Sequence, residues 1–514
     1  MITKQYQVSI RTGKSRRKLL WIGTFFLSLA VTFIAGLVFM DLKRMGTLDI
    51  LLILLSIAVG VVSIVPAVIS LRSHNHSFDF FHPLLYAAWF FFIPQFAFAG
   101  IFLAFNAIQS SFSALLMDQR YFQIQTLMMV ILGSLGLSFG YFLYIGRWMG
   151  DKLPTLRVFS APPEALKKAA FIFLLIGFMA QIKAFEEGLI GYQFNADISS
   201  TEAIFASFAS LAVVGQGIVW FCFFRNRGNW WFFALMASLL ILFDVFISGS
   251  RGALFHAMIP IIAGYQYTRK KDRFRKMWKW FLILVIVVFI GMIFGTMFRI
   301  NVLSAYGRTT SLTISDVTNF SSETIRSVRQ QSFGGVVQFG WQKILERMDA
   351  LSSMAVIVAN AERLKGAEIA LGIHNNIIRD SFTSFIPRII WPSKPIVGGA
   401  EVIGNLYFYT KYNSPAVTYM GDLFRNFGVW GIFPGMMLIG IALRTIYRWL
   451  IEGRQLTPMR VGIFMLLGFT VHYESMYSSF LPSLVRKMFM IVIGVLLVSF
   501  LLSSAKPRAT SLPQ

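Results

Sequence analysis

The chain has 514 residues, of which 56% carry hydrophobic side chains and only 14% are charged. A soluble protein carries about 25% charged residues, so this composition excludes an ordinary soluble domain and indicates a polytopic membrane protein. The net charge of +24 is not a nucleic-acid signal, because most of it falls in segments that the positive-inside rule assigns to the cytoplasm, where anionic membrane lipids are the expected partner.

Apolar stretches of about 20 residues, the length that crosses a hydrocarbon core of about 30 Å, recur along the chain. We therefore expect an all-α fold with about twelve transmembrane helices. The predicted spans lie at residues 19–40, 48–71, 83–105, 124–145, 167–185, 203–224, 230–247, 252–268, 278–298, 427–447, 459–479 and 484–503. The first stretch is long and lacks a small-residue cleavage site, so we expect it to be a retained span and not a signal peptide.

These spans divide the chain into three parts. Residues 1–298 form a membrane domain with the first nine helices, residues 299–419 form one large extramembrane loop, and residues 420–514 contain the last three helices. The basic clusters at residues 14–18 and 269–276 mark the cytoplasmic side. We therefore expect a multi-pass inner-membrane protein with both termini in the cytoplasm and the large loop on the periplasmic or external side.

The large loop has three parts. Residues 308–332 are rich in Ser and Thr, which is typical of irregular or mobile structure. Residues 341–364 carry apolar side chains at helical spacing, which predicts one amphipathic helix that lies on the outer surface or caps the bundle. Residues 366–419 mix Pro, Gly, aromatic and charged residues, which predicts turns and short helices over the membrane domain.

Metal and disulfide chemistry are not expected. Cys222 is the only cysteine and cannot form an intramolecular disulfide or a thiolate metal site. The sequence has no metal-ligand cluster and no phosphate-binding Gly-rich pattern. We therefore predict a reaction without a metal ion or another cofactor.

The external side instead carries cations at the depth of the membrane surface. Guanidinium groups match the paired oxygens of a diphosphate, and several of them could stabilise a diphosphate leaving group without a metal. The alternative is structural, because such side chains also extend to lipid headgroups or bridge helices. The residues concerned are Arg251, Arg299, Arg388, Lys394 and Arg425.

A polyprenyl-diphosphate-linked sugar fits such a set of cations. Transfer of its glycan to an acceptor hydroxyl group would also need a general base. The candidates on the external side are His374, Asp380, Glu401, Asp422 and Glu474. For each of them a helix cap, salt bridge or turn is the alternative role. His374 is the preferred candidate, because it lies in a turn before a predicted helix and imidazole titrates near neutral pH.

Three strings, Ser248–Gly252, Ile386–Pro395 and Tyr419–Gly431, occur in this order on the same predicted side. Together with the topology, they resemble the O-antigen polymerase (Wzy-type) family of oligosaccharide repeat-unit polymerases. The resemblance implies a metal-independent inner-membrane glycosyltransferase of lipopolysaccharide or polysaccharide biosynthesis. Such an enzyme transfers a growing glycan from undecaprenyl diphosphate to the next lipid-linked repeat unit, and a chain-length regulator is an implied partner.

The resemblance assigns a catalytic or diphosphate-binding role to Arg251 and Arg388, and then to Lys394 and Arg425. His374 with Asn375 also resembles a His-Asn pair in the related O-antigen ligases. Together with the residue chemistry, this gives the predicted catalytic residues Arg251, Arg388, His374 and Asp422, and the predicted substrate-binding residues Arg299, Lys394, Arg425 and Glu474.

Alternative functions remain open at this point. An O-antigen ligase shares the chemistry but transfers the finished chain to a lipid A core. A transporter or flippase of lipid-linked oligosaccharide predicts charged residues deep in the bundle and a modest outer loop, whereas here the loop is large. A polysaccharide-assembly scaffold without activity is the remaining alternative.

Overall fold

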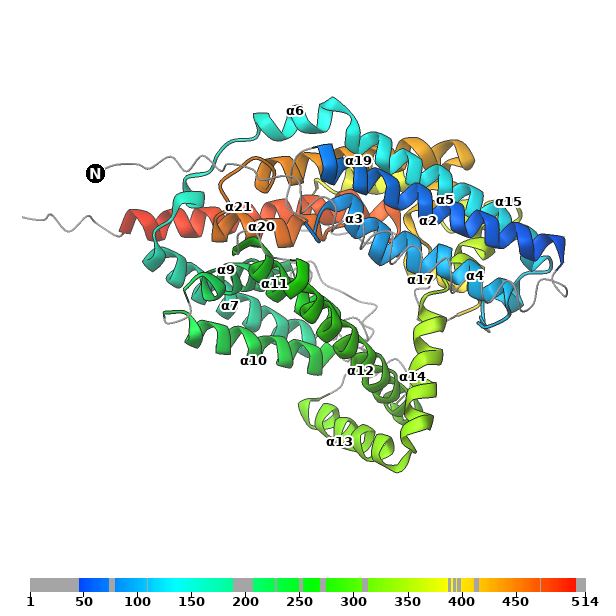
Figure 1. The fold of residues 1–514 in the computed structure, drawn as a ribbon, viewed down its shortest axis with the longest axis horizontal. Helices are drawn as coiled ribbons and strands as arrows, with labels where there is room; N and C mark the ends of the chain where they lie inside the picture. The colour runs from blue at the N-terminus through cyan, green and yellow to red at the C-terminus, as the bar shows by residue number, and fades with distance from the viewer. Residues whose placement is uncertain are drawn as a thin grey trace, which may run out of the picture. The chain divides into compact units, whose positions relative to one another are not determined.

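The structure is a computed structural model. It describes residues 46–73, 79–108, 110–187, 207–226, 229–248, 253–268, 274–306, 313–386, 390–391, 394, 399–410, 416–471 and 473–504. All regular elements among these residues are helices, as expected for an all-α protein (Figure 1). The chain divides into a first unit, Met1–Leu51, and a second unit, Leu52–Gln514. In the first unit only residues 46–51 are described.

Six helical segments of the described residues are long and apolar enough to cross a membrane. This confirms a helical membrane protein. The segments correspond to α2 (Thr47–Ser73), the continuous run α3 (Pro83–Ala87), η2 (Ala88–Phe98) and α4 (Ala99–Ala104), α5 (Gln119–Phe142), α7 (Pro163–Glu186), α19 (Val429–Leu450), and η5 (Tyr477–Ser479) with α21 (Phe480–Ser504).

Other predicted spans agree with the described helices to different degrees. Helices at residues 231–248 and 253–268 coincide with the predicted spans 230–247 and 252–268. The helix at 211–225 is shorter than the predicted span 203–224, and the helix at 274–306 extends beyond both ends of 278–298. The first predicted span, residues 19–40, lies outside the described residues. The predicted span 459–479 is an α-helix only as far as Gly468, because the chain then turns away. The described elements of the membrane parts outside the six candidate spans are α6 (Tyr144–Lys152), α9 (Leu211–Arg225), α10 (Trp231–Ser248), α11 (Ala253–Thr268), α12 (Phe274–Tyr306) and α20 (Pro458–Gly468), with the short turns η3 (Ser113–Leu115) and η4 (Arg157–Ser160).

Between α12 and α19 the chain is more helical than the sequence predicts. The elements are α13 (Ile314–Gln330), α14 (Phe333–Arg347), α15 (Ala350–Ala370), α16 (Asn376–Thr383), α17 (Ala400–Phe408) and α18 (Tyr419–Phe427). The turns and short helices expected from residue 366 onward are confirmed by α16, α17 and α18.

Two predictions for this region are wrong. Residues 314–330 are not irregular but form α13, because Thr313 and Asp316 make a reciprocal capping box and Val317 and Phe320 pack on α12. Residues 341–364 are not one helix. The helix stops at Arg347, and a new one begins after Asp349, whose carboxylate accepts a hydrogen bond from the Ser352 amide at 2.9 Å.

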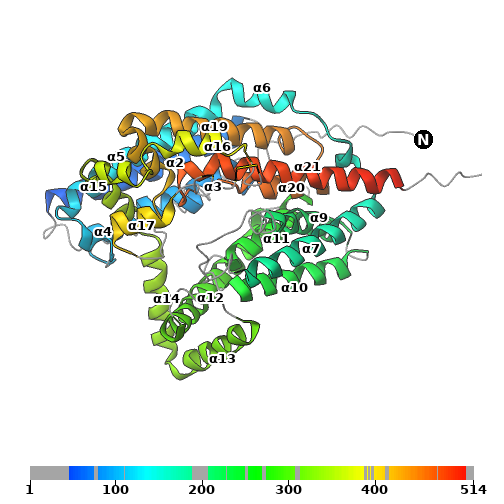
Figure 2. The same cartoon turned by 180° about the vertical axis from the view of Figure 1, so that it is seen from behind.

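Close helix packing fixes the frame around the site. Helices α5 and α19 lie side by side in both views (Figures 1 and 2). Gly140 of α5 faces the Met437 carbonyl and Gly440 of α19 faces the Leu137 carbonyl so closely that a Cβ atom would overlap either oxygen. A second core joins α7, α9, α11, α19 and α20 through buried apolar side chains. Helix α18 then leads directly into α19.

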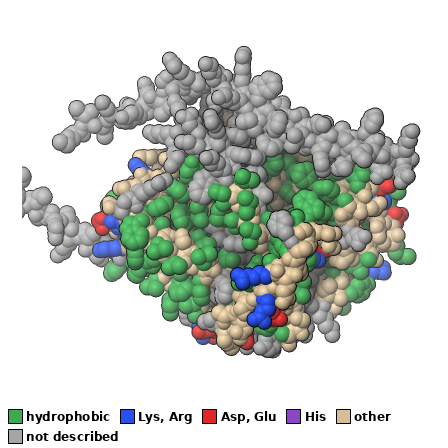
Figure 3. Space-filling model, turned by 60° about the horizontal axis from the view of Figure 1, so that its bottom comes forward, with side chains coloured by type: hydrophobic (Ala, Val, Ile, Leu, Met, Phe, Trp, Pro, Cys, Tyr) green, Lys and Arg blue, Asp and Glu red, His purple; other side chains and the backbone are tan. Residues whose placement is uncertain are grey.

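The outward faces of the long helices are apolar. Leu54 of α2, Leu239 of α10 and Leu496 of α21 are 59%, 58% and 64% exposed. Hydrophobic side chains cover much of the described surface in Figure 3, with charged side chains in small groups. Exposed apolar side chains on long apolar helices are expected where a helix faces lipid and not water.

Candidate functional site

Arg425 is the centre of a buried polar cluster. Its side chain has no exposed surface and forms ion pairs with Glu368 at 3.1 Å and with Asp422 at 2.7 Å. It also donates hydrogen bonds to the Ile373 carbonyl oxygen at 2.8 Å and to the Asn376 side-chain oxygen. This guanidinium therefore joins α15, α16 and α18.

The local sequence of α18 explains half of the cluster. The Thr418 hydroxyl accepts a hydrogen bond from the Gly421 amide at 3.1 Å and caps the helix. Asp422 and Arg425 are three residues apart and so lie on one helical face. Asn426, one residue further, donates to the carboxylate of Asp422 at 3.1 Å. A nine-residue helix thus presents one continuous polar face to the loop helices.

The turn after α15 supplies the other half and holds the predicted base. Gly372 at φ +65° and Asn375 at φ +52° let the chain reverse direction between α15 and α16. The Nδ1 atom of His374 then lies 3.4 Å from Glu368 Oε2, while the Tyr407 hydroxyl donates to Glu368 Oε1 at 2.8 Å. The His374 side chain is 22% exposed, so an orienting carboxylate below it leaves the imidazole accessible.

The neighbouring carboxylates stabilise the charge on the Arg425 guanidinium. Burial alone would lower the pKa of Arg425, but the carboxylates of Asp422 and Glu368 outweigh burial and raise it. Burial and the Glu368 carboxylate raise the pKa of Tyr407, so its hydroxyl remains a donor. One guanidinium thus faces two buried carboxylates, and His374 contacts one of them, Glu368.

The cluster is fixed to the chain between α20 and α21. Asp422 Oδ2 accepts a hydrogen bond from the Ser478 amide at 2.8 Å. At the other end of α18, the Thr418 amide donates to the Glu474 carbonyl oxygen at 3.3 Å. Thr418 and Arg425 are separated by two turns, which is about 10 Å of helix rise. Helix α18 therefore sets the spacing between the Arg425 cluster and Glu474.

Glu474 forms a more open polar group. Arg347, at the end of α14, pairs with Glu474 Oε2 at 2.5 Å, and the Gln95 amide donates to Glu474 Oε1. The side chains of Arg347 and Glu474 are 57% and 34% exposed. Gln95 is 6% exposed and its own oxygen has no hydrogen-bond partner among the described residues. It belongs to a π-helix, a geometry often found at functional sites.

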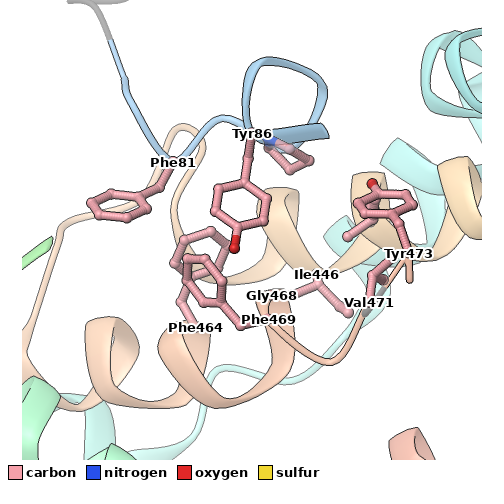
Figure 4. Close-up of a pocket in the computed structure, with 10 residues that line it drawn as sticks. Phe81, Tyr86, Ile446, Phe464, Gly468, Phe469, Val471 and Tyr473 are labelled. Carbon is pink, nitrogen blue, oxygen red and sulfur yellow. The ribbon is translucent and has the colours of Figure 1, made fainter. Parts of the chain in front are cut away.

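An aromatic cavity borders this segment. Figure 4 shows the rings of Tyr86 and Phe469 facing one another. Tyr473 lines the same cavity beyond Val471. Tyr473 directly precedes Glu474, so the polar group and the cavity share one stretch of chain. The cavity is lined by Phe81, Pro83, Tyr86, Leu443, Ile446, Phe464, Gly468, Phe469, Val471 and Tyr473.

No family model, no curated protein and no solved structure matches this chain.

The structure joins three of the predicted site residues in one network: His374, Asp422 and Arg425. Glu474 is connected to them through α18. Arg251 and Arg388 lie outside the described residues.

The other predicted or candidate site residues that the structure describes lie outside this network or have different contacts. Arg299 lies on α12, next to Phe298 at the contact with α13. Lys394 is 9% exposed and donates a hydrogen bond to the Ile386 carbonyl oxygen at 3.1 Å. Asp380 is buried and accepts hydrogen bonds from Asn376 and Arg379. Glu401 is exposed in the first turn of α17.

Glu368, Asn376, Arg347 and Gln95 were not among the predicted site residues. One signal for Glu368 was available, because it interrupts the apolar spacing of Leu364 and Leu371 on one helical face. The described residues contain no group of three or more His, Cys, Asp or Glu side chains that could hold a metal ion.

Proposed function

We propose that this chain is a membrane glycosyltransferase that polymerises undecaprenyl-diphosphate-linked repeat units, as the resemblance to O-antigen polymerases implies. The observation that carries the proposal is the His374 imidazole, partly exposed and held by the buried Glu368–Arg425 pair. A base oriented by a fixed carboxylate is suited to removing a proton from a hydroxyl group.

The proposed topology has about twelve spans, both termini in the cytoplasm and the site on the periplasmic or external side of the inner membrane. The apolar outward faces of α2, α10 and α21 support the membrane location. The positive-inside pattern of the sequence supports the orientation.

The proposed reaction is one glycosyl transfer. The acceptor hydroxyl of the incoming repeat unit loses its proton to His374, and its oxygen bonds to the anomeric carbon of the donor glycan. The bond from that carbon to the diphosphate oxygen breaks, and undecaprenyl diphosphate leaves with the electron pair. Asp422 and Glu368 act through Arg425 and His374 and are positioning residues.

Glu474 and Arg347 are proposed to bind the substrates. Their partial exposure supports this role, since the Arg347 guanidinium can exchange Glu474 for a diphosphate. Glu474 and the Gln95 oxygen then have acceptor atoms for sugar hydroxyl groups. Arg251 and Arg388 remain proposed contributors to the stabilisation of the leaving group.

Disruption of the gene in its host, followed by separation of the surface glycans by size, tests this function. Loss of the long ladder, with one repeat unit left on its carrier or core, supports a polymerase. Full-length polymer stranded on the carrier would instead indicate a ligase. Repeat units trapped on the cytoplasmic face would indicate a flippase, and an unchanged glycan profile would contradict all three.

A further inference from the structure

Two adjacent cations, Arg486 and Lys487, lie within the candidate span Tyr477–Phe500. Ionisable side chains inside a span are rare and usually face a partner, a cavity or a ligand. Within the described part of the chain, no carboxylate interacts with either side chain. Neither cation was among the predicted site residues, and neither belongs to the Arg425 or Glu474 groups.

Lys487 is directed toward the protein and not toward the lipid. It lies four and eleven residues before Ile491 and Val498, which are 5% and 0% exposed and share its helical face. The opposite face carries Phe489 and Leu496, which are 59% and 64% exposed. Lys487 is half-buried and Arg486 is exposed. The pair therefore occupies the edge between the packed face and the outer face.

The depth of the pair follows from helix geometry. Side chains of an α-helix tilt toward its N-terminus, so both cations extend toward the end of α21 that begins at Phe480. That end contacts α16 and η5, where the Ser478 amide binds Asp422. The cationic groups thus extend toward the membrane surface that carries the candidate site.

Helix α16 adds an apolar surface at the same end. Ile378 and Phe382 are 51% and 75% exposed, while Ile377 and Asp380 on the other face are buried. An amphipathic helix of this kind lies well at the boundary between headgroups and acyl chains. Arg486 and Lys487 of α21 and the apolar face of the contacting helix α16 together fit a ligand that has a phosphate group on a long hydrocarbon chain.

We propose that Arg486 and Lys487 form a binding site for the phosphate group of a membrane lipid. Arg binds phosphate oxygens in pairs and Lys adds a point charge. The lipid can be the polyprenyl diphosphate of the substrate or an anionic phospholipid. The first choice rests on the proposed function, whereas the phosphate site itself does not.

The test uses the full-length protein in phosphatidylcholine nanodiscs with added undecaprenyl diphosphate, phosphatidylglycerol or inorganic pyrophosphate. The readout is the shift of the thermal unfolding midpoint with ligand concentration. We expect protection of the wild type by at least one of the two lipids, and an apparent Kd about tenfold or more higher for Arg486→Gln/Lys487→Gln. The conservative variant Arg486→Lys/Lys487→Arg should retain protection.

A matched control removes two exposed charges from α13 by Arg326→Gln/Arg329→Gln and should behave like the wild type. Protection by the diphosphate lipid alone identifies the substrate carrier, and equal protection by phosphatidylglycerol identifies a phospholipid site. Equal apparent Kd values for wild type and the Gln double variant would overturn the proposal, as would protection only by pyrophosphate. Because binding is measured without polymerisation, an unchanged glycan profile on gene disruption would refute the proposed function and leave this site standing.

Discussion

At the scale of single residues, Arg425 supports the candidate site from inside the protein. Its side chain is not exposed and contacts Glu368, Asp422, the Asn376 side chain and the Ile373 carbonyl oxygen. The diphosphate-binding role expected from the sequence therefore suits Arg347, whose guanidinium is accessible, better than Arg425.

Replacing Arg425 by Gln should lower the free energy of unfolding by about 3–5 kcal/mol, because Glu368 and Asp422 would remain buried without their cation. Thermal unfolding in detergent measures the loss. The matched control is Arg363→Gln on the exposed face of α15, which should change stability by less than about 0.5 kcal/mol. Similar unfolding midpoints for the two variants would contradict the proposed pairing.

The buried carboxyl of Asp79, between α2 and α3, should make the stability of the folded protein depend on pH. Burial raises the pKa of its carboxyl, although hydrogen bonds from Tyr447, the Phe81 amide, Tyr267 and Gln266 oppose the rise. The folded state therefore holds this proton to higher pH than the unfolded state. The contribution of Asp79 to the free energy of unfolding is largest below its ordinary pKa of 3.8, and it is lost as the pH rises through the higher pKa of the folded state.

Asp79→Asn should reduce this fall, because the amide cannot ionise. Unfolding midpoints measured from about pH 4 to pH 8 give the slope. A smaller slope should remain in the variant, since burial also raises the pKa of Asp349. An unchanged slope after Asp79→Asn would show that this carboxyl does not titrate with folding.

At the scale of elements, hydropathy predicts the long membrane helices well, because a span is defined by its length and composition. Polar elements are harder to predict. The Ser/Thr-rich composition of α13 resembled a loop, although its cap and its apolar pair Val317 and Phe320 specify a helix. The break before α15 was missed because the apolar spacing continues across Asp349.

The site was predictable only in part for a similar reason. His374, Asp422 and Arg425 carry recognisable chemistry and were expected on one side of the membrane. Their partner Glu368 lies 57 residues before Arg425, and no local pattern indicates that the two pair. Arg347 and Glu474 are 127 residues apart, and a single sequence likewise gives no pattern that predicts their contact.

The α5–α19 interface gives a prediction at this scale. Gly140→Ala should destabilise the protein by about 1–3 kcal/mol, because its Cβ would overlap the Met437 carbonyl oxygen. Gly366→Ala is the control, since nothing lies within 4 Å of its Cβ position in α15 and it should stabilise by about 0.5–1 kcal/mol. Thermal unfolding compares both variants. Stabilisation by Gly140→Ala would show that the two helices are not in close contact.

At the scale of the whole molecule, orientation in the membrane connects the helices to the proposed chemistry. Cys222 is buried and the chain has no other cysteine, so Cys222→Ala provides a background for single-cysteine labelling. Ser322→Cys on α13 should react with a membrane-impermeant maleimide applied from outside the inner membrane. Lys152→Cys at the end of α6 should react only after permeabilisation. Labelling of both positions from the same side would contradict the proposed topology.

In the proposed reaction His374, held by Glu368, removes the proton from the acceptor hydroxyl. The most direct measurement is polymer formation by purified wild type and His374→Gln from lipid-linked repeat units extracted from the disruption strain, with Glu362→Gln on the exposed face of α15 as control. We expect a rate about 10²–10⁴-fold lower for His374→Gln, with an unchanged unfolding midpoint, and a normal rate for the control. Polymer formation by His374→Gln at the wild-type rate would contradict this role.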